Sequence, residues 1–421
     1  MDFFEFLNTA VTPYHTVDAL KSFFKANSFT EIELGANLEP AKAYFVCREA
    51  SIIAFRTPQK WSDESKFKIA LAHTDFPTLK ISPNPDVVNA GVCTLHTEVY
   101  GSPLYTSWLD RDLGYAGMLA YVEAGSSTLK TKLFRGEKLF RIPQLAVHLN
   151  RGVNQDGLKV NPQIDFNALW ACASDNKASE NRKNLFVKAL EKELPEGSRL
   201  IDFDVQLFDA QSANRGGFND EWIYSGRLDN LSSCHAIAEA MVSAKSAESD
   251  CLVACFFNNE EVGSTTREGA ASNFLKSVLD SLTSPLSSLA SRLSSSIALS
   301  IDMAHAEHPN HTEKHELNHA PLLGKGIVLK TNSQKRYASD LMSSAQLRLL
   351  CEKAEIPLQV FIMRNDMPCG STVGPTVSAN LGIPTVDIGE PMLSMHSIRE
   401  MMAASDHEDM IKLVKALYCY S

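Results

Sequence analysis

The sequence predicts an α/β protein in which a mixed, mostly parallel sheet is sandwiched by helices and interrupted by an inserted β-rich domain. First, apolar runs of strand length end abruptly at turn residues, as in CLVACFF at 251–257, which is typical of strands buried on both faces. Second, stretches with helical periodicity alternate with such runs near both ends of the chain. Third, residues 83–222 consist mainly of short β-like runs separated by Gly, Pro and Asn. We therefore predict a discontinuous main domain, residues 1–82 and 223–421, and an insert, residues 83–222.

Length and composition restrict the class of protein. The 421 residues suit two or three domains, and 44% apolar with 21% charged residues are typical of a globular chain. A net charge of −10 without a basic tract argues against nucleic acid as a partner. The N-terminus does not resemble a secretory leader and no apolar run is long enough to span a membrane. The nine Cys lie mostly within apolar runs and form no CxxC pair, so we expect reduced thiols and a cytoplasmic location.

The main domain begins with an amphipathic helix at 16–27, for which Thr16 can serve as the N-cap. Short strands around 44–46 and 51–55 follow and are expected to pair as a hairpin. These elements belong to the scaffold.

The next strand starts at Phe67 and is broken by Pro77, which leaves His73 and Asp75 at its end. His-x-Asp places both side chains on one face of a strand. This geometry suits a metal-binding His73, with Asp75 either ligating the metal or holding the imidazole in place. The alternative is a histidine that ends a strand and has no metal role.

The insert contains β-like runs such as VCTLHTEVY, KLFRI, LAVHLNRGV (145–153) and RLIDFDVQLF, with one helical segment at 180–194. Nothing in it resembles a second catalytic centre. His148, within LAVHLNRGV, is interpreted either as a residue that lines a site or as an ordinary β-strand histidine.

Three acidic residues follow the insert at places where site residues are expected. Asp229 stands at the start of a predicted helix, 226–245, where it can be either a site residue or only an N-cap. Glu260 and Glu261 follow the apolar strand 251–257, and sites in open α/β sheets form beyond the carboxyl ends of such strands. Adjacent glutamates point in different directions, so one can bind a metal while the other moves a proton. On its own, the pair could equally be a solvated loop.

The C-terminal half repeats the pattern of strands and helices. An apolar strand at 297–301 ends in Asp302, followed by His305, and a later strand at 384–389 leads to His396. The Ser-rich segment 283–296 is left open between a flexible connection and a short helix. Helices are expected at 267–282, 339–354 and 406–418, and the loop 367–375 is expected to open another helix.

When these strands are placed in one sheet, a set of metal-binding residue types gathers at one rim: His73, Asp229, Glu261, Asp302 and His396, with Asp75 and Glu260 beside them. Two imidazoles and three carboxylates without Cys suit Zn²⁺, and Mn²⁺ or Co²⁺ accept the same donors. One carboxylate must bridge if two ions are to lie about 3.5 to 4 Å apart. The sequence therefore predicts a two-metal site.

Eight blocks of the sequence resemble the aspartyl aminopeptidase family of co-catalytic zinc peptidases, in that family's order: LAHTDFPTLK, GRLDNL, NNEEVGS, DMAHAEHPN, KHELNHAPLLGKG, NSQKRYAS, RNDMPCGSTVGP and MHSIREM. SWLDRDL and RIPQLAVHLNR are similar to its inserted domain. The resemblance covers nearly the whole chain. Two departures are Asn259, where the family more often has Asp, and the Ser-rich segment 283–296.

The resemblance implies a role for each residue of the predicted site. His73 and Asp302 would bind one metal ion, Glu261 and His396 the other, and Asp229 would bridge both. The catalytic residues would be Glu260 as general base, Asp75 to orient His73, and His148. The peptide bond between Asp229 and Asn230 would be cis.

The resemblance also implies a substrate and an assembly. The enzyme would remove single N-terminal residues, preferentially acidic ones, from peptides with a free N-terminus, and Lys330, Tyr337 and His305 would contact the substrate. The insert would form a dimer that sends His148 into the neighbouring active site, and dimers would build a tetrahedral homododecamer around an enclosed chamber.

Other functions remain compatible with the residues themselves. A related two-metal deacylase or dipeptidase would use the same metal ligands, and an aminopeptidase of this type could prefer neutral residues. A protein of a different class, a metal-free scaffold that has kept the fold, would contain no bound zinc when purified.

Overall fold

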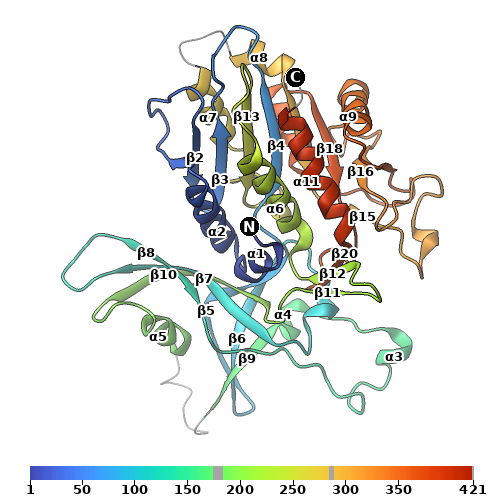
Figure 1. Ribbon diagram of the computed structural model, residues 1–421. Helices are drawn as coiled ribbons and strands as arrows, with labels where there is room; N and C mark the ends of the chain where they lie inside the picture. The colour runs from blue at the N-terminus through green and yellow to red at the C-terminus, as the bar shows by residue number, and fades with distance from the viewer. Residues whose placement is uncertain (174–183, 284–288, 420–421) are drawn as a thin grey trace. The chain divides into compact units, whose positions relative to one another are not determined.

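The computed structural model describes residues 1–173, 184–283 and 289–419. The chain forms two compact units (Figure 1). Unit 1 comprises Met1–Phe76, Ala213–Met395 and Glu400–Ser421, and unit 2 comprises Pro77–Ser212 and His396–Arg399. The predicted division lay at residues 82 and 222, and it did not anticipate that the short segment 396–399 clusters with the insert.

Unit 1 is built on a large mixed sheet. Among its described residues, nine strands form this sheet in the order β1 (Thr30–Glu31), β2 (Ala43–Arg48), β3 (Ser51–Arg56), β13 (Cys251–Phe257), β4 (Phe67–His73), β14 (Ile297–Ile301), β18 (Thr385–Gly389), β16 (Ile327–Lys330) and β17 (Leu358–Phe361). The four central strands β13, β4, β14 and β18 run parallel to one another. β3 and β16 pair antiparallel with the outer two of them. The predicted mixed, mostly parallel α/β fold is confirmed.

Helices cover both faces of this sheet, as predicted. One face packs against α1 (Phe3–Thr9), α2 (Pro13–Ala26), α6 (Leu228–Ser243), α9 (Leu341–Lys353) and α11 (Ala404–Cys419), and the other against α7 (Phe274–Thr283), α8 (Leu289–Ser295) and α10 (Val373–Leu381).

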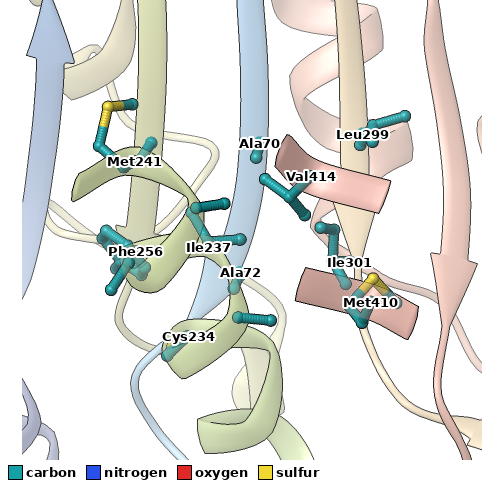
Figure 2. Packing of buried hydrophobic residues seen from close by; sticks show 14 of the residues in the cluster. Ala70, Ala72, Cys234, Ile237, Met241, Phe256, Leu299, Ile301, Met410 and Val414 are labelled. Atoms are coloured by element: carbon teal, nitrogen blue, oxygen red, sulfur yellow. The ribbon is translucent and has the colours of Figure 1, made fainter. Parts of the chain in front are cut away.

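The side chains of the central strands alternate between these two layers. In β4, Ala70 and Ala72 join the first layer while Ile69 and Leu71 join the second. Figure 2 shows the first layer, where α6 lies over Phe256 and the two alanines, and α11 packs near β14. Because Ala70 and Ala72 are small, α6 and α11 can approach the sheet closely. Because helices cover both faces of β4, the strand is apolar on both faces.

A smaller sheet completes unit 1. In the part of the chain that the structure describes, it contains five strands in the order β11 (Asn214–Gly216), β12 (Trp222–Ser225), β20 (Glu400–Ala403), β19 (Pro391–Leu393) and β15 (Ala304–His305). β12 leads directly into α6, and β15 follows closely after β14. This sheet therefore borders the carboxyl ends of the central strands.

Unit 2 is β-rich, as expected for the insert. Its described residues form a six-stranded antiparallel sheet in the order β8 (Lys130–Arg135), β7 (Leu113–Val122), β10 (Arg199–Asp209), β5 (Thr78–Asn89), β6 (Val92–Tyr100) and β9 (Asn167–Cys172). It also contains η1 (Tyr105–Trp108), α3 (Val153–Asp156), α4 (Pro162–Asp165) and α5 (Leu185–Glu191). Aromatic side chains such as Tyr115, Phe140 and Phe186 form its core.

The structure corrects several local predictions. The first long helix is capped by the Thr12 hydroxyl, which accepts from the His15 amide, and not by Thr16, which lies inside the helix. α7 begins at Phe274 rather than at 267. Of the helix predicted at 180–194, only 185–191 is helical in the described residues, and 180–183 lie outside them. In the Ser-rich segment, α8 is a short helix, while 284–288 lie outside the described residues.

The predicted strand at 145–153 was wrong. All of these residues are described: 145–152 form a loop with a turn at 147–149, and Val153 begins α3. Leu145 and Leu149 are 68% and 75% exposed, so the alternation of apolar residues that resembled a half-buried strand does not face a core. His148 is exposed on this loop. None of the helices in the described ranges is long and apolar enough to cross a membrane.

Candidate metal centre

Three neighbouring strands bring most of the predicted ligands to one edge of the large sheet. His73 is the last residue of β4, Asp302 directly follows β14, and Glu260 and Glu261 lie in the short η2 turn (Glu260–Val262) after β13. β4 pairs in parallel with both β13 and β14. The carboxyl ends of the three strands therefore meet, which is where sites form in open α/β sheets.

Asp229 reaches the same place from the start of α6. Its backbone is not helical, with φ −79° and ψ 104°, and the peptide bond to Asn230 is cis, as predicted. The Asn230 side-chain amide donates to the backbone oxygen of Ile301 at 2.9 Å, which ties the helix start to the end of β14.

The donor atoms of these residues converge. His73 Nε2 lies 3.4 Å from Asp229 Oδ1 and 3.5 Å from Asp302 Oδ1. Two donors that each lie about 2.0–2.1 Å from one tetrahedral zinc ion are about 3.4 Å apart. His73 also forms a group with Glu260 and Glu261 in which one donor atom from each residue lies within 4.8 Å of the others. The distances within the first set match those between donors to one zinc ion, and the second set gathers further donors beside it.

Asp75 is completely buried beside this cluster, and its carboxylate links the end of β4 to the η2 turn. Oδ1 accepts from the Glu260 amide and Oδ2 from the Glu261 amide, both at 3.1 Å. His73 Nδ1 lies 3.0 Å from the backbone oxygen of Asp75 and 3.4 Å from its Oδ1. The shorter contact that orients His73 is therefore to the backbone of Asp75, and the carboxylate mainly holds the turn that carries the two glutamates.

Lys330, the last residue of β16, contacts this cluster through Asp302 and is 3% exposed. Its ammonium donates to the backbone oxygen of Met303 at 2.8 Å and lies 3.4 Å from Asp302 Oδ2. It also lies 5.1 Å from the ring centroid of Tyr337, a buried residue. The two predicted substrate contacts Lys330 and Tyr337 are thus adjacent, and the lysine also touches a predicted metal ligand.

The density of carboxylates shifts the ionisation of the centre. Burial alone lowers the pKa of His73, but contacts with Asp229, Asp302 and Asp75 outweigh it and raise this pKa well above its usual value. For Glu260, burial raises the pKa to about 8, and the nearby carboxylates act in the same direction while His73 opposes them. A dense group of carboxylates is stabilised when cations neutralise it.

Three further predicted residues belong to other elements of the chain. His305, in β15, lines a cavity of about 230 Å³ together with Phe361, Met363 and Met392. His396 belongs to the segment that clusters with unit 2, where its Nδ1 forms a hydrogen bond with the backbone oxygen of Ser102 at 3.0 Å. His148 lies on the exposed loop of unit 2.

One buried acidic residue at this site was not predicted. Glu400, the first residue of β20, is 2% exposed, and its Oε2 accepts from the Asp229 amide at 3.1 Å. Glu400 stands four residues after His396 in the MHSIREM block, and this proximity in sequence to a predicted ligand could have drawn attention to it. Its local pattern does not identify its partner, which is 171 residues away in the sequence.

Comparison with known proteins identifies the family. The family model described as aminopeptidase I zinc metalloprotease (M18) matches residues 6–418, nearly the entire chain. The chain belongs to the M18 family. It is therefore a metal-dependent aminopeptidase, a hydrolase of peptide bonds, as the sequence predicted.

Curated M18 relatives match over almost their full length. A probable M18 family aminopeptidase 2 from Pseudomonas aeruginosa is 37% identical over 420 residues, covering 99% of this chain and 97% of the relative. Aspartyl aminopeptidase 4 from Saccharomyces cerevisiae is 36% identical over 460 residues, covering 99% and 94%.

Solved M18 structures share the fold. The structure of Ape4 in complex with Nbr1 has a TM-score of 0.93 and 34% identity, covering 99% of this chain and 84% of that one. The dodecamer of mApe1 from S. cerevisiae has a TM-score of 0.85 and 26% identity, covering 99% and 95%.

Proposed function

We propose that this M18 aminopeptidase removes single N-terminal residues, with a preference for Asp and Glu, at a site that holds two divalent metal ions. The observation that carries the proposal is the convergence of imidazole and carboxylate donors at the ends of β13, β4 and β14, with Glu260 among them. Zinc is the metal we expect because the family is one of zinc metalloproteases, and Mn²⁺ or Co²⁺ could replace it.

Each ligand has a proposed place. His73 and Asp302 would hold one ion, Glu261 and His396 the other, and Asp229 would bridge them. The distances from His73 Nε2 to Asp229 and Asp302 support the first part of this assignment. Bound divalent ions supply Lewis acidity, which polarises the scissile carbonyl and lowers the pKa of water.

The chain's own residues provide the proton transfers and the positioning. Glu260 would take a proton from the attacking water and give it to the leaving amine. Asp75 would hold the amides of Glu260 and Glu261 so that the two carboxylates keep their separate roles. The surrounding carboxylates would bind the free α-amino group of the substrate.

The acidic preference is supported by Lys330 and by the name of the yeast aspartyl aminopeptidase relative. The Lys330 ammonium lies against Asp302, a proposed metal ligand. In an aminopeptidase, the side chain of the substrate's N-terminal residue must lie close to the metal ions. An acidic side chain in that position would therefore be near the Lys330 ammonium. Tyr337 and His305 would contact the same residue. The alternative of a preference for neutral residues is decided by experiment.

We also propose assembly through unit 2, with dimers building a dodecamer like that of mApe1, and with His148 donated to a partner's active site. The exposed apolar residues Leu145, Val147 and Leu149 around His148 support an interface role for this loop. Sedimentation analysis of the purified protein tests the assembly. A monomer under all conditions would refute it.

The substrate proposal is tested with aspartyl, glutamyl and leucyl chromogenic substrates, using metal-stripped protein reloaded with Zn²⁺, Mn²⁺ or Co²⁺. We expect activity only after metal addition and the highest kcat/KM for the acidic substrates. Lys330→Met should lower the acidic activities far more than the leucyl activity. Lys68→Met is the matched control, because Lys68 is also a buried lysine, paired with Asp250 near the opposite end of β4. Equal losses on all substrates would refute the role of Lys330 in selectivity.

A further inference from the structure

Glu400 is a buried carboxylate that the proposed reaction does not use. It begins β20 and pairs through its backbone with Ser225 of β12, close to the start of α6. Its side chain is 2% exposed, and Oε2 accepts the Asp229 amide hydrogen at 3.1 Å. A charged group in this setting requires a compensating interaction.

The backbone amide of Asp229 needs an acceptor from outside the helix because of its position at the start of α6. The first amides of an α-helix have no acceptor within the helix, and Asp229 is the second residue of α6. The residue is buried, so water cannot easily serve instead. A carboxylate forms the stronger, charge-assisted type of hydrogen bond with an amide. The position of this amide sets the direction in which the Asp229 carboxylate leaves the backbone.

Two other proposed ligands, Glu261 and Asp302, are held in comparable ways. The amides of Glu260 and Glu261 donate to the Asp75 carboxylate, and Asp302 lies against the Lys330 ammonium. Glu400 gives Asp229 the kind of support that Asp75 gives the glutamate pair. In each case a buried charged side chain from another element supports the residue that carries the ligand.

We propose that Glu400 is a positioning residue that sets the metal affinity of the centre by holding the backbone of Asp229. This inference rests on the proposed role of Asp229 as a metal ligand. It concerns the hydrogen bond, not the negative charge alone. Loss of an outer partner of a metal ligand typically weakens metal binding by about 10- to 100-fold.

Three substitutions separate the hydrogen bond from the charge. Glu400→Gln keeps an acceptor oxygen at the same reach but removes the charge. Glu400→Asp keeps the charge but shortens the side chain by one methylene group, which withdraws the acceptor. Glu400→Met fills a similar volume and removes both. If the methionine variant does not fold, the comparison of Gln with Asp still decides.

The measurement is the dissociation constant for zinc alone, obtained by competition with a fluorescent chelator on metal-stripped full-length protein. We expect Glu400→Asp and Glu400→Met to bind zinc about 10- to 100-fold more weakly than the wild type, with Glu400→Gln within about threefold of it. In reloaded protein, kcat should fall for the Asp and Met variants and recover for Gln. Wild-type affinity in the Met or Asp variant, or a Gln variant as weak as Met, would overturn the proposal.

Two further variants complete the design. Asp406→Asn is the matched control, because Asp406 is also buried and accepts two backbone amides, those of Gly324 and Gly326, at 2.7 and 2.9 Å. It should lower the melting temperature without weakening zinc binding, and equal weakening would show that the Glu400 effect is only general destabilisation. Asp229→Asn tests the underlying assignment. If it leaves zinc binding intact, the proposed metal site is wrong, which differs from a failure of Glu400 alone.

Discussion

Replacement of Asp75 by Asn separates two roles that the sequence could not distinguish. The carboxylate could orient the imidazole of His73, or it could hold the turn that carries Glu260 and Glu261. The distances favour the second role, because both oxygens accept amides of the turn at 3.1 Å. His73 Nδ1 instead has its shorter contact, 3.0 Å, with the backbone oxygen of Asp75, which the substitution leaves in place.

The size of the effect follows from the hydrogen bonds that change. Asparagine keeps one acceptor oxygen but turns an NH₂ group toward the other amide, so one charge-assisted hydrogen bond worth about 1.5–3 kcal/mol is lost. If all of this energy serves to place Glu260, kcat falls by about 10- to 150-fold, because about 1.4 kcal/mol corresponds to a factor of ten. If the remaining oxygen keeps the Glu261 amide, both the proposed ligand Glu261 and the backbone contact of His73 keep their support, so the metal content should stay near the wild-type value.

The assay measures kcat, bound zinc and melting temperature on the same preparations, with Asp406→Asn as the control. That variant also loses one of two amide contacts of a buried carboxylate, but away from the proposed ligands. We expect a lower melting temperature in both variants and a large loss of kcat only in Asp75→Asn. Loss of zinc in proportion to activity would refute the reasoning, and so would a kcat within about threefold of the wild type.

Three other predictions address the reaction, the assembly and the response to pH. Glu260→Gln should lower kcat by about 10²- to 10⁴-fold while both ions stay bound, and near-normal turnover in this variant would exclude Glu260 as the general base. Mixtures of inactive Glu260→Gln and His148→Ala subunits should regain activity after subunit exchange if His148 acts in trans, whereas a histidine acting within its own chain would leave every mixture inactive. Burial, followed by the neighbouring His407, lowers the pKa of His235 to about 3. The unfolded chain, with a His pKa of about 6.5, therefore binds an additional proton between these values, so the free energy of unfolding should fall with decreasing pH by up to about 1.4 kcal/mol per unit. His235→Gln should remove this component in denaturant titrations from pH 6.5 to 4, and parallel curves for the two proteins would contradict the assignment.

The sequence by itself determined the fold class and the family. Continuous apolar runs ending in polar residues identified β4, β13 and β14, because strands covered on both faces must be apolar throughout. The same pattern placed His73 and Asp302 at or just beyond strand ends, and the motif blocks pointed to the aminopeptidase family to which the chain belongs.

Local patterns failed where exposure or a distant neighbour determines the structure. The run at 145–153 was predicted as a strand, but its leucines are exposed and it forms a loop that leads into α3. The apolar pattern alone does not reveal whether a core lies on one side. The N-cap of the first long helix is Thr12 because its hydroxyl can reach the His15 amide, whereas either threonine fits the sequence pattern.

Only the tertiary structure decided which groups hold the proposed ligands in place. Asp75 meets the amides of Glu260 and Glu261 across 185 and 186 residues, and Glu400 meets that of Asp229 across 171. The Lys330 ammonium lies against Asp302 because β16 and β14 both flank β18. Such contacts depend on the spatial order of the strands in the sheet. The spacing of residues along the chain does not reveal that order. The physical reason is that a ligand's chemistry is local, while the hydrogen bonds that aim it come from elements that only folding brings together.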